Sequence, residues 1–329
     1  MKDASEPQAL PATAKQGVVL RSTAGFFDIL LGSGDIVRAR LRGRLKRVRQ
    51  NTDLCVIGDQ VVVVESRDGG FSVEEVLPRR TVFSRQHPAR GGHREDVLIA
   101  NLDVLVIVMA YEAPPFVPRM IDRFLVIAEH NGVDAILVAN KFDLRIEEDD
   151  YIDDALSLYE SLGYRCVRTC ATPVAPGEAE EDPGVLTLRE LLAGRVSAFS
   201  GPSGAGKSSL VNRIEPGLDL RVGATSEAHG KGRHTTRVAT LHPLTGGGFI
   251  ADTPGIRELA SFEIPAPQLA ACFREFRPFL GQCTYRSCKH LTEPGCAILA
   301  AVESEDIDSD RYESFAKLLL GEERPDRVG

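Results

Sequence analysis

The sequence lacks a hydrophobic run long enough to cross a membrane. Its most apolar stretch, Val97–Ala110, is short and is interrupted by Asn101 and Asp103, whereas a membrane-spanning helix needs about 20 apolar residues. Residues 1–16 also lack the apolar core of a signal peptide, and we expect a flexible tail there. These absences predict a cytoplasmic protein without a membrane partner.

Basic residues are in deficit, because 39 Lys and Arg stand against 47 Asp and Glu, a net charge of −8. Taken alone, this charge argues against nucleic-acid binding. The basic residues are unevenly distributed, however, and residues 38–49 contain seven of them with no acidic residue. Such a concentration predicts RNA phosphate binding, with a solubilising exposed edge as the alternative. The predicted RNA-binding residues are Arg38, Arg40, Arg42, Arg44, Lys46, Arg47 and Arg49.

Disulfides are not expected among the seven cysteines, because the chain shows no export signal. Three cysteines instead cluster with a histidine in the pattern Cys283-x4-Cys288-x-His290-x5-Cys296. Three thiolates and an imidazole form the ligand set of a closed, structural Zn²⁺ site. No open coordination position remains for catalysis. The alternative is an accidental cluster of cysteines.

A glycine-rich segment follows the apolar run Val196–Phe199 and precedes a helical pattern. This order of strand, loop and helix is typical of a phosphate-binding loop, whose backbone N–H groups surround phosphate oxygens. Lys207 would reach the β- and γ-phosphates, and the Ser208 hydroxyl would bind Mg²⁺. A glycine-rich turn without a ligand is the alternative. The predicted loop comprises Gly201, Pro202, Ser203, Gly204, Ala205, Gly206, Lys207, Ser208 and Ser209.

The four residues Asn140, Lys141, Phe142 and Asp143 fit N-K-x-D, the guanine-reading loop of GTPases. A carboxylate at Asp143 suits guanine, which presents N1–H and an amino group as adjacent donors that adenine lacks. Asn140 would brace the loop, and the Lys141 stem would lie along the base. A chance surface turn is the alternative. After the next expected strand come Cys170 and Ala171, at the position usually written Ser-Ala in GTPases, where the contact is mainly through backbone.

The γ-phosphate side of the site is predicted from Asp252-Thr253-Pro254-Gly255, a D-x-x-G pattern. Asp252 would approach Mg²⁺ through water, and the Gly255 N–H would contact the γ-phosphate. In the basic, glycine-rich segment 230–237, Thr236, or alternatively Thr235, would complete the Mg²⁺ shell. Ile256 stands where many GTPases carry a water-orienting Gln. His234 is our catalytic candidate beside Lys207 and Thr236; the alternative is that His234 contacts only RNA or solvent.

The motifs occur in the order N-K-x-D, Cys-Ala, P-loop, switch Thr and D-x-x-G, which is the usual GTPase order cut and rejoined. With the cysteine cluster, this order resembles the circularly permuted, small-subunit-dependent ribosomal GTPases of the RsgA/YjeQ family, over residues 17–320. The resemblance implies an α/β P-loop GTPase domain, circularly permuted, between an N-terminal all-β OB-fold barrel and a C-terminal, mostly helical zinc-binding domain. The expected divisions are a tail (1–16), the OB-fold RNA-binding domain (17–80), a linker (81–95), the GTPase domain (96–264) and the zinc domain with a C-terminal helix (265–329).

We therefore expect a monomeric GTP hydrolase that binds the small ribosomal subunit and its rRNA, uses Mg²⁺ with GTP, releases GDP and carries one structural Zn²⁺. Hydrolysis stimulated by the ribosome would drive release at a late maturation checkpoint. One alternative is a GTP-dependent RNA-binding scaffold whose hydrolysis is incidental. A P-loop kinase or ATPase with a zinc ribbon is disfavoured by Asp143. A GTPase serving the large subunit is disfavoured by the OB-like and zinc segments together.

Overall fold

The computed structural model describes residues 13–43, 54–66, 69–86, 95–146, 150–171, 181–218, 239–253 and 264–322. The chain forms two compact units. One comprises residues 1–101 with 236–242, and the other comprises residues 102–235 with 243–329. Within the described ranges, no helix is long and apolar enough to cross a membrane.

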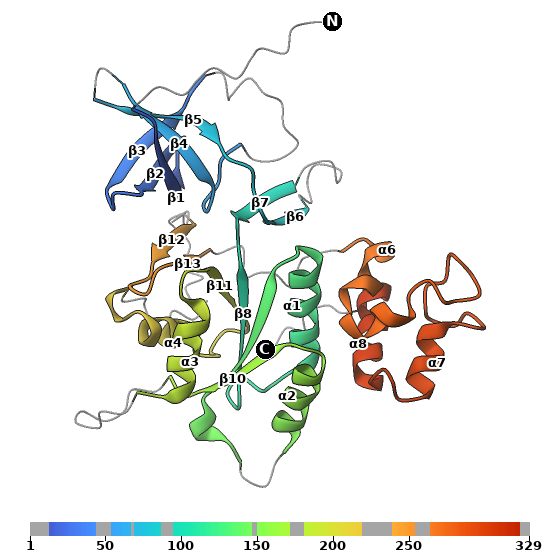
Figure 1. Cartoon of the computed structure of the whole chain (residues 1–329). Coiled ribbons are helices and arrows are strands. Elements are labelled where there is room, and N and C mark those ends of the chain that lie inside the picture. Colours follow the sequence, from blue (N-terminus) through green and yellow to red (C-terminus); the bar gives the residue numbers. More distant parts are fainter. Residues whose placement is uncertain are drawn as a thin grey trace, which may run out of the picture. The chain divides into compact units, whose positions relative to one another are not determined.

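The first unit contains a five-stranded barrel (Figure 1). Its strands follow the order β1-β2-β3-β5-β4, and β4 pairs back onto β1 to close the barrel. Apolar residues alternate with polar ones and fill the interior, among them Val19, Ile29 and Val61. The closure confirms the expected N-terminal barrel. The strands are β1 (Lys15–Thr23), β2 (Phe26–Leu31), β3 (Ile36–Leu41), β4 (Gln60–Glu65) and β5 (Phe71–Val76), and β12 (Thr240–Pro243) pairs with β1 at Arg21 and Thr240.

A hairpin that the sequence did not predict follows the barrel. Strand β6 (Val82–Gln86), inside the expected linker, pairs antiparallel with β7 (Glu95–Ala100). The end of β7 packs tightly against the barrel at Gly58, where a Cβ atom would lie 2.1 Å from the Ala100 carbonyl oxygen. The Asn101 side chain donates to the Gly58 carbonyl at 2.9 Å. The hairpin therefore belongs to the barrel unit.

The second unit is built on a five-stranded parallel sheet. The sheet order is β10-β9-β8-β11-β13. All seven residues of the central strand β8 are buried, as expected for a parallel sheet covered on both faces. The strands are β8 (Val104–Ala110), β9 (Asp134–Asn140), β10 (Arg165–Thr169), β11 (Val196–Ser200) and β13 (Phe249–Asp252).

Helices cover both faces of this sheet, as Figure 1 shows. On one face α3 (Pro183–Leu192) and α4 (Lys207–Ile214) pack on alternate residues of β8 and β9. On the other face lie α1 (Pro118–His130) and α2 (Tyr151–Ser161). Helix α1 starts with Pro118, which suits a first helical turn, and α3 is capped by Asp182, which accepts a hydrogen bond from the Val185 N–H. The expected alternation of strands and helices is confirmed.

The C-terminal part of the second unit is helical and packs against α1. Its core contains the rings of Phe273, Phe276 and Phe315, with centroids 5.0–5.6 Å apart, and Val126 of α1 joins this core. Asp308 caps α8 by accepting from two backbone N–H groups. The elements are α6 (Ala266–Leu269), η5 (Ala270–Cys272), η6 (Arg274–Phe279), α7 (Ala297–Glu303) and α8 (Ser309–Leu320).

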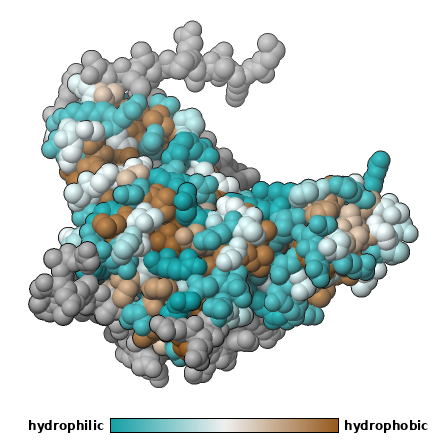
Figure 2. Space-filling view, turned by 60° about the horizontal axis from the view of Figure 1, so that its bottom comes forward, coloured by the Kyte–Doolittle hydropathy of each residue, from teal (hydrophilic) through white to brown (hydrophobic). Residues whose placement is uncertain are grey.

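In the space-filling view, apolar surface occurs in separate small areas among hydrophilic residues (Figure 2).

Candidate functional site

The glycine-rich loop after β11 has a backbone that only glycine tolerates at two positions. Gly201 has φ +132°, and a Cβ there would lie 2.1 Å from the Val108 carbonyl oxygen of the neighbouring strand. Gly206 has φ +91° and would place a Cβ 2.2 Å from the Asn140 Nδ2 atom. Helix α4 begins immediately afterwards, at Lys207. Its N-terminus and the open loop form a geometry suited to phosphate oxygens.

Asn140 joins the predicted guanine loop to the phosphate loop. It is the last residue of β9 and is 1% exposed. Its Nδ2 donates to the Ala205 carbonyl at 2.8 Å. Its Oδ1 accepts from the Thr169 hydroxyl at 3.0 Å and from the Ala171 N–H at 3.2 Å. One buried amide therefore connects three segments that lie far apart in the sequence.

Asp143 lies in the short helix η2 (Phe142–Leu144), directly after the end of β9. Its Oδ1 is 3.1 Å from the Cys170 Sγ, which donates to it. Lys141 has a left-handed backbone conformation, and its Nζ donates to the carbonyl oxygens of Glu112 and Ala113. The sequence predicted Cys170 as a backbone contact; its side chain in addition holds the carboxylate that is predicted to read guanine.

Lys207 points back over its own loop. Its Nζ donates to the Gly201 carbonyl at 2.8 Å and to the Pro202 carbonyl at 2.6 Å. Ser208, in the first turn of α4, is half-buried. Asp252 ends β13, which is hydrogen-bonded to the strand that leads into the phosphate loop. His234, Thr235, Thr236 and Gly255 lie outside the described residues, so their assignments stay predictions.

Of the predicted RNA-binding residues, Arg38 and Arg40 lie on β3, and Arg42 follows the last residue of this strand. Arg38 and Arg40 are exposed, and the Arg40 guanidinium stacks 4.2 Å from the centre of the Phe26 ring. Two carboxylates are their neighbours: Arg38 pairs with Asp28 at 2.8 Å, and Arg42 pairs with the buried Glu74. Carboxylates on neighbouring strands therefore neutralise part of the positive charge of this basic segment. Arg44, Lys46, Arg47 and Arg49 lie outside the described residues.

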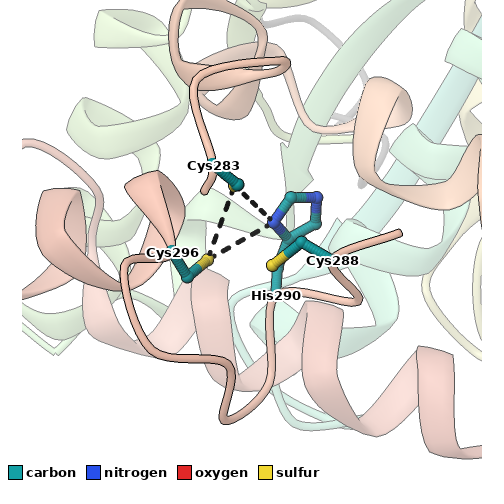
Figure 3. A group of neighbouring side chains, drawn as sticks. All are labelled: Cys283, Cys288, His290 and Cys296. Carbon is teal, nitrogen blue, oxygen red and sulfur yellow. Dashed lines mark hydrogen bonds between the residues drawn. The ribbon is translucent and has the colours of Figure 1, made fainter. Parts of the chain in front are cut away.

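Cys283, Cys288, His290 and Cys296 converge, as Figure 3 shows. Their ligand atoms all lie within 4.8 Å of one another. The His290 Nδ1 is 3.5 Å from the Cys283 Sγ and 3.4 Å from the Cys296 Sγ. Burial raises the pKa of the Cys288 thiol to about 12 and lowers the pKa of His290. Three sulfurs and one imidazole nitrogen suit a tetrahedral metal such as Zn²⁺, which deprotonates its thiol ligands.

Sequence reasoning missed two side chains that support these clusters. Thr169, fully buried, holds the Asn140 amide. Glu293 accepts from the backbone N–H groups of Lys289, Leu291 and Thr292 at 2.9–3.1 Å, and these bonds lower the pKa of its carboxyl to about 2. The only sequence signal was their position, immediately before Cys170 and inside the Cys288–Cys296 loop. Thr169 contacts a predicted site residue, and Glu293 contacts backbone groups next to two others, Cys288 and His290.

Comparisons of this chain with known proteins agree on one family. Residues 76–262 match the family model described as RsgA GTPase. A protein of Gemmatimonas aurantiaca named small ribosomal subunit biogenesis GTPase RsgA is 43% identical over 309 residues, covering 93% of this chain and 97% of the relative. The protein with the same name from Moorella thermoacetica is 39% identical, covering 92% of this chain and 96% of the relative.

Two solved structures have the same fold. YjeQ from Thermotoga maritima superposes with a TM-score of 0.73 at 31% identity, covering 94% of this chain and 98% of that one. YloQ, described as a circularly permuted GTPase, gives a TM-score of 0.71 at 26% identity, with coverages of 95% and 97%.

A P-loop that follows its guanine loop in the sequence, on a parallel sheet in a chain that also carries a barrel and a Cys/His cluster, defines a circularly permuted GTPase. The matched domain and the full-length relatives are more specific. The chain belongs to the RsgA GTPase family and is a GTP hydrolase.

Proposed function

We propose that this GTPase acts in maturation of the small ribosomal subunit, binding the subunit with GTP and leaving it after hydrolysis. The observation that carries the nucleotide specificity is the Asn140 amide, which connects the loop carrying Asp143 to the phosphate loop. The subunit assignment follows the relatives, which are named small ribosomal subunit biogenesis GTPases. The cellular setting we propose is the cytoplasm, and the protein acts as a monomer.

In this proposal the guanine base is read by Asp143 with Asn140 and Lys141, beside Cys170 and Ala171. The phosphates lie on Gly201–Ser209, and Lys207 leaves its carbonyl partners to reach the β- and γ-phosphates. Two of its contacts are to backbone oxygens of the same loop, and an arriving phosphate replaces them. The helix N-terminus adds a favourable field for the anion.

Mg²⁺ fits the hydroxyl of Ser208 and the carboxylate of Asp252, because hard oxygen ligands suit this ion. Thr236 completes the set, and Gly255 contacts the γ-phosphate. When bound, Mg²⁺ neutralises charge that develops on the phosphate oxygens. Zn²⁺ fits Cys283, Cys288, His290 and Cys296, and its contribution is to fold the segment that carries them.

The proposed RNA contact uses the strand β3 arginines and the basic residues that follow them in the sequence. Arg40 contributes an exposed guanidinium group, while Arg38 and Arg42 must exchange Asp28 and Glu74 for phosphate. A surface that binds phosphate in this way gives an affinity that falls steeply as salt rises.

Single-turnover GTP hydrolysis measured with small subunits, with large subunits and without ribosomes tests this function. We expect stimulation by small subunits alone, and completion of such sites by a partner accelerates hydrolysis about 10³–10⁵-fold in other GTPases. Equal rates in all three reactions would favour an RNA-binding scaffold with incidental hydrolysis. His234→Ala is expected to lower the stimulated rate while GDP affinity is kept; an unchanged rate removes His234 from the mechanism.

A further inference from the structure

A cavity of about 520 Å³ lies in the second unit between α1, α2 and α8, apart from the nucleotide site and the cysteine cluster. This volume is in the range of small-molecule and side-chain binding pockets. Apolar groups of Phe116, Val117, Pro118 and Leu158 line part of it. Neither the proposed GTPase cycle nor the proposed zinc site uses it.

The inner part of the cavity is lined by buried polar side chains that bond to one another. Arg311, 1% exposed, pairs with Asp122 of α1 and with Glu275 of η6. Tyr159 donates its hydroxyl proton to Asp122 at 2.6 Å, and burial raises the pKa of this hydroxyl well above its ordinary value. Because these groups already hydrogen-bond to one another, a ligand that enters gains little by competing with them.

The outer part of the cavity has an excess of negative charge. Asp154, Asp308 and Asp310 line it and are exposed, and within the described ranges none of the three has an ion pair. The cation at the rim, Arg119, is already paired with Glu313 at 2.7 Å. The exposed ring of Tyr151 also lines the cavity. Carboxylates beside an aromatic face favour an organic cation and repel phosphate.

One buried polar group in the lining has no partner. Ser314 of α8 is 1% exposed, and its Oγ makes no hydrogen bond within the described part of the chain. A buried hydroxyl without a partner is costly, whereas a ligand N–H or carbonyl group could satisfy it. This observation is independent of the acidic rim, and a turn of the Ser314 side chain toward the cavity would let a ligand satisfy this hydroxyl.

We propose that this cavity binds an organic cation with an apolar stem, a guanidinium or alkylammonium group. The stem lies along the apolar lining, and the cationic head lies among Asp154, Asp308, Asp310 and the Tyr151 ring. The same chemistry is presented by a basic side chain of a partner protein and by a free polyamine. The inference does not depend on the proposed ribosomal role.

Calorimetric titration of the full chain at low salt tests the site with three probes. N-acetyl-arginine amide carries the guanidinium, N-acetyl-citrulline amide is its neutral isostere, and spermidine represents the polyamines. We expect saturable binding of a cation, with the neutral isostere at least about tenfold weaker. Tighter binding of spermidine identifies a polyamine, and equal or tighter binding of the arginine derivative identifies a side chain.

Two variants locate the binding. The double substitution Asp154→Asn with Asp310→Asn is expected to weaken cation binding at least about tenfold, and Glu303→Gln, which removes an exposed charge from α7 outside the cavity, is expected to leave it unchanged. GDP affinity, measured in the same samples, reports an intact fold. The proposal is overturned if the neutral isostere binds equally, if no probe saturates, or if both variants bind the cation like the parent chain.

Discussion

The nucleotide loops and the cysteine cluster differ in what holds them together. At the nucleotide loops, neutral hydrogen bonds within the chain connect the segments, and the Asn140 amide alone makes three of them. At the cluster, three sulfurs and an imidazole approach within 4.8 Å, and three thiolates this close together repel one another unless a cation lies between them. We therefore expect the nucleotide site to be preorganised before its ligand binds and the cluster to depend on a bound metal ion.

The contrast has a limit, because the cluster stands beside an apolar core. Phe273, Phe276 and Phe315 pack with Val126 of α1, and these contacts are between apolar side chains of the chain itself. We therefore expect loss of the ion to unfold the segment 283–296 and to weaken the rest of the C-terminal part.

The largest expected effect is that of Cys288→Ala. The variant loses zinc and more than about 4 kcal/mol of stability in the C-terminal part, because the metal supplies the folding free energy of its loop. Zinc content by elemental analysis and thermal unfolding measure the effect.

Cys272→Ala is the matched control, since Cys272 is a buried cysteine of the same region outside the cluster. We expect full zinc content and a loss of about 1 kcal/mol of stability, from packing and from one weak thiol hydrogen bond to the Gln268 carbonyl. A zinc-free Cys288→Ala protein as stable as the parent would show that the ion does not hold this loop.

Asn140→Ala should have the next largest effect. It tests whether hydrogen bonds within the chain hold the nucleotide loops in place. The substitution leaves the Thr169 hydroxyl, the Ala171 N–H and the Ala205 carbonyl without their partner. We expect the free energy of GDP binding to weaken by about 3 kcal/mol. Calorimetry would then show a GDP affinity more than about 100-fold weaker.

Asn131→Ala provides the comparison, because Asn131 also uses its amide, donating to Ile127 at the end of α1, away from the loops. Its GDP affinity should equal that of the parent chain. If Asn140→Ala binds GDP normally, the loops do not depend on this amide.

The fold class was predictable because its signals are local. Glycines at positions 201 and 206 are demanded by positive φ and close contacts, and buried strands such as β8 are continuous apolar runs. The resemblance to the RsgA/YjeQ family predicted a circularly permuted GTPase domain from these signals. The family model and a similar solved structure confirm this prediction.

Contacts between distant segments were not predictable. The carboxylates of Asp28 and Glu74 lie outside the basic run yet pair with Arg38 and Arg42 across strands. Strand β6 was assigned to a linker because its pairing partner, β7, lies beyond a polar stretch. The hydrophobic periodicity of a sequence identifies the residues that share one face of a helix or strand. The pairing of one strand with another depends on the tertiary structure.

Glu293→Gln should have a smaller effect, confined to the cluster. The carboxylate accepts from three backbone N–H groups between the cluster residues, and an amide offers one oxygen in place of two. Because groups that orient metal ligands tune affinity, we expect zinc binding to weaken about tenfold, with zinc still bound at saturation. Competition with a chromogenic chelator measures the affinity, and Glu303→Gln on α7 should match the parent. Equal affinities for both variants would show that Glu293 does not shape the site.

The smallest expected effect is at Cys170, whose thiol is 3.1 Å from the Asp143 carboxylate. Cys170→Ala removes this donor and should weaken GDP binding about fivefold, since a single hydrogen bond contributes about 1 kcal/mol. Cys170→Ser keeps a donor and should bind GDP like the parent. The loss should be smaller for inosine diphosphate, which lacks the amino group that Asp143 is predicted to read, so the preference for GDP falls in the alanine variant alone. If alanine and serine variants show the same preference, the thiol does not orient the carboxylate, and the backbone at Cys170 and Ala171 alone forms this side of the guanine site.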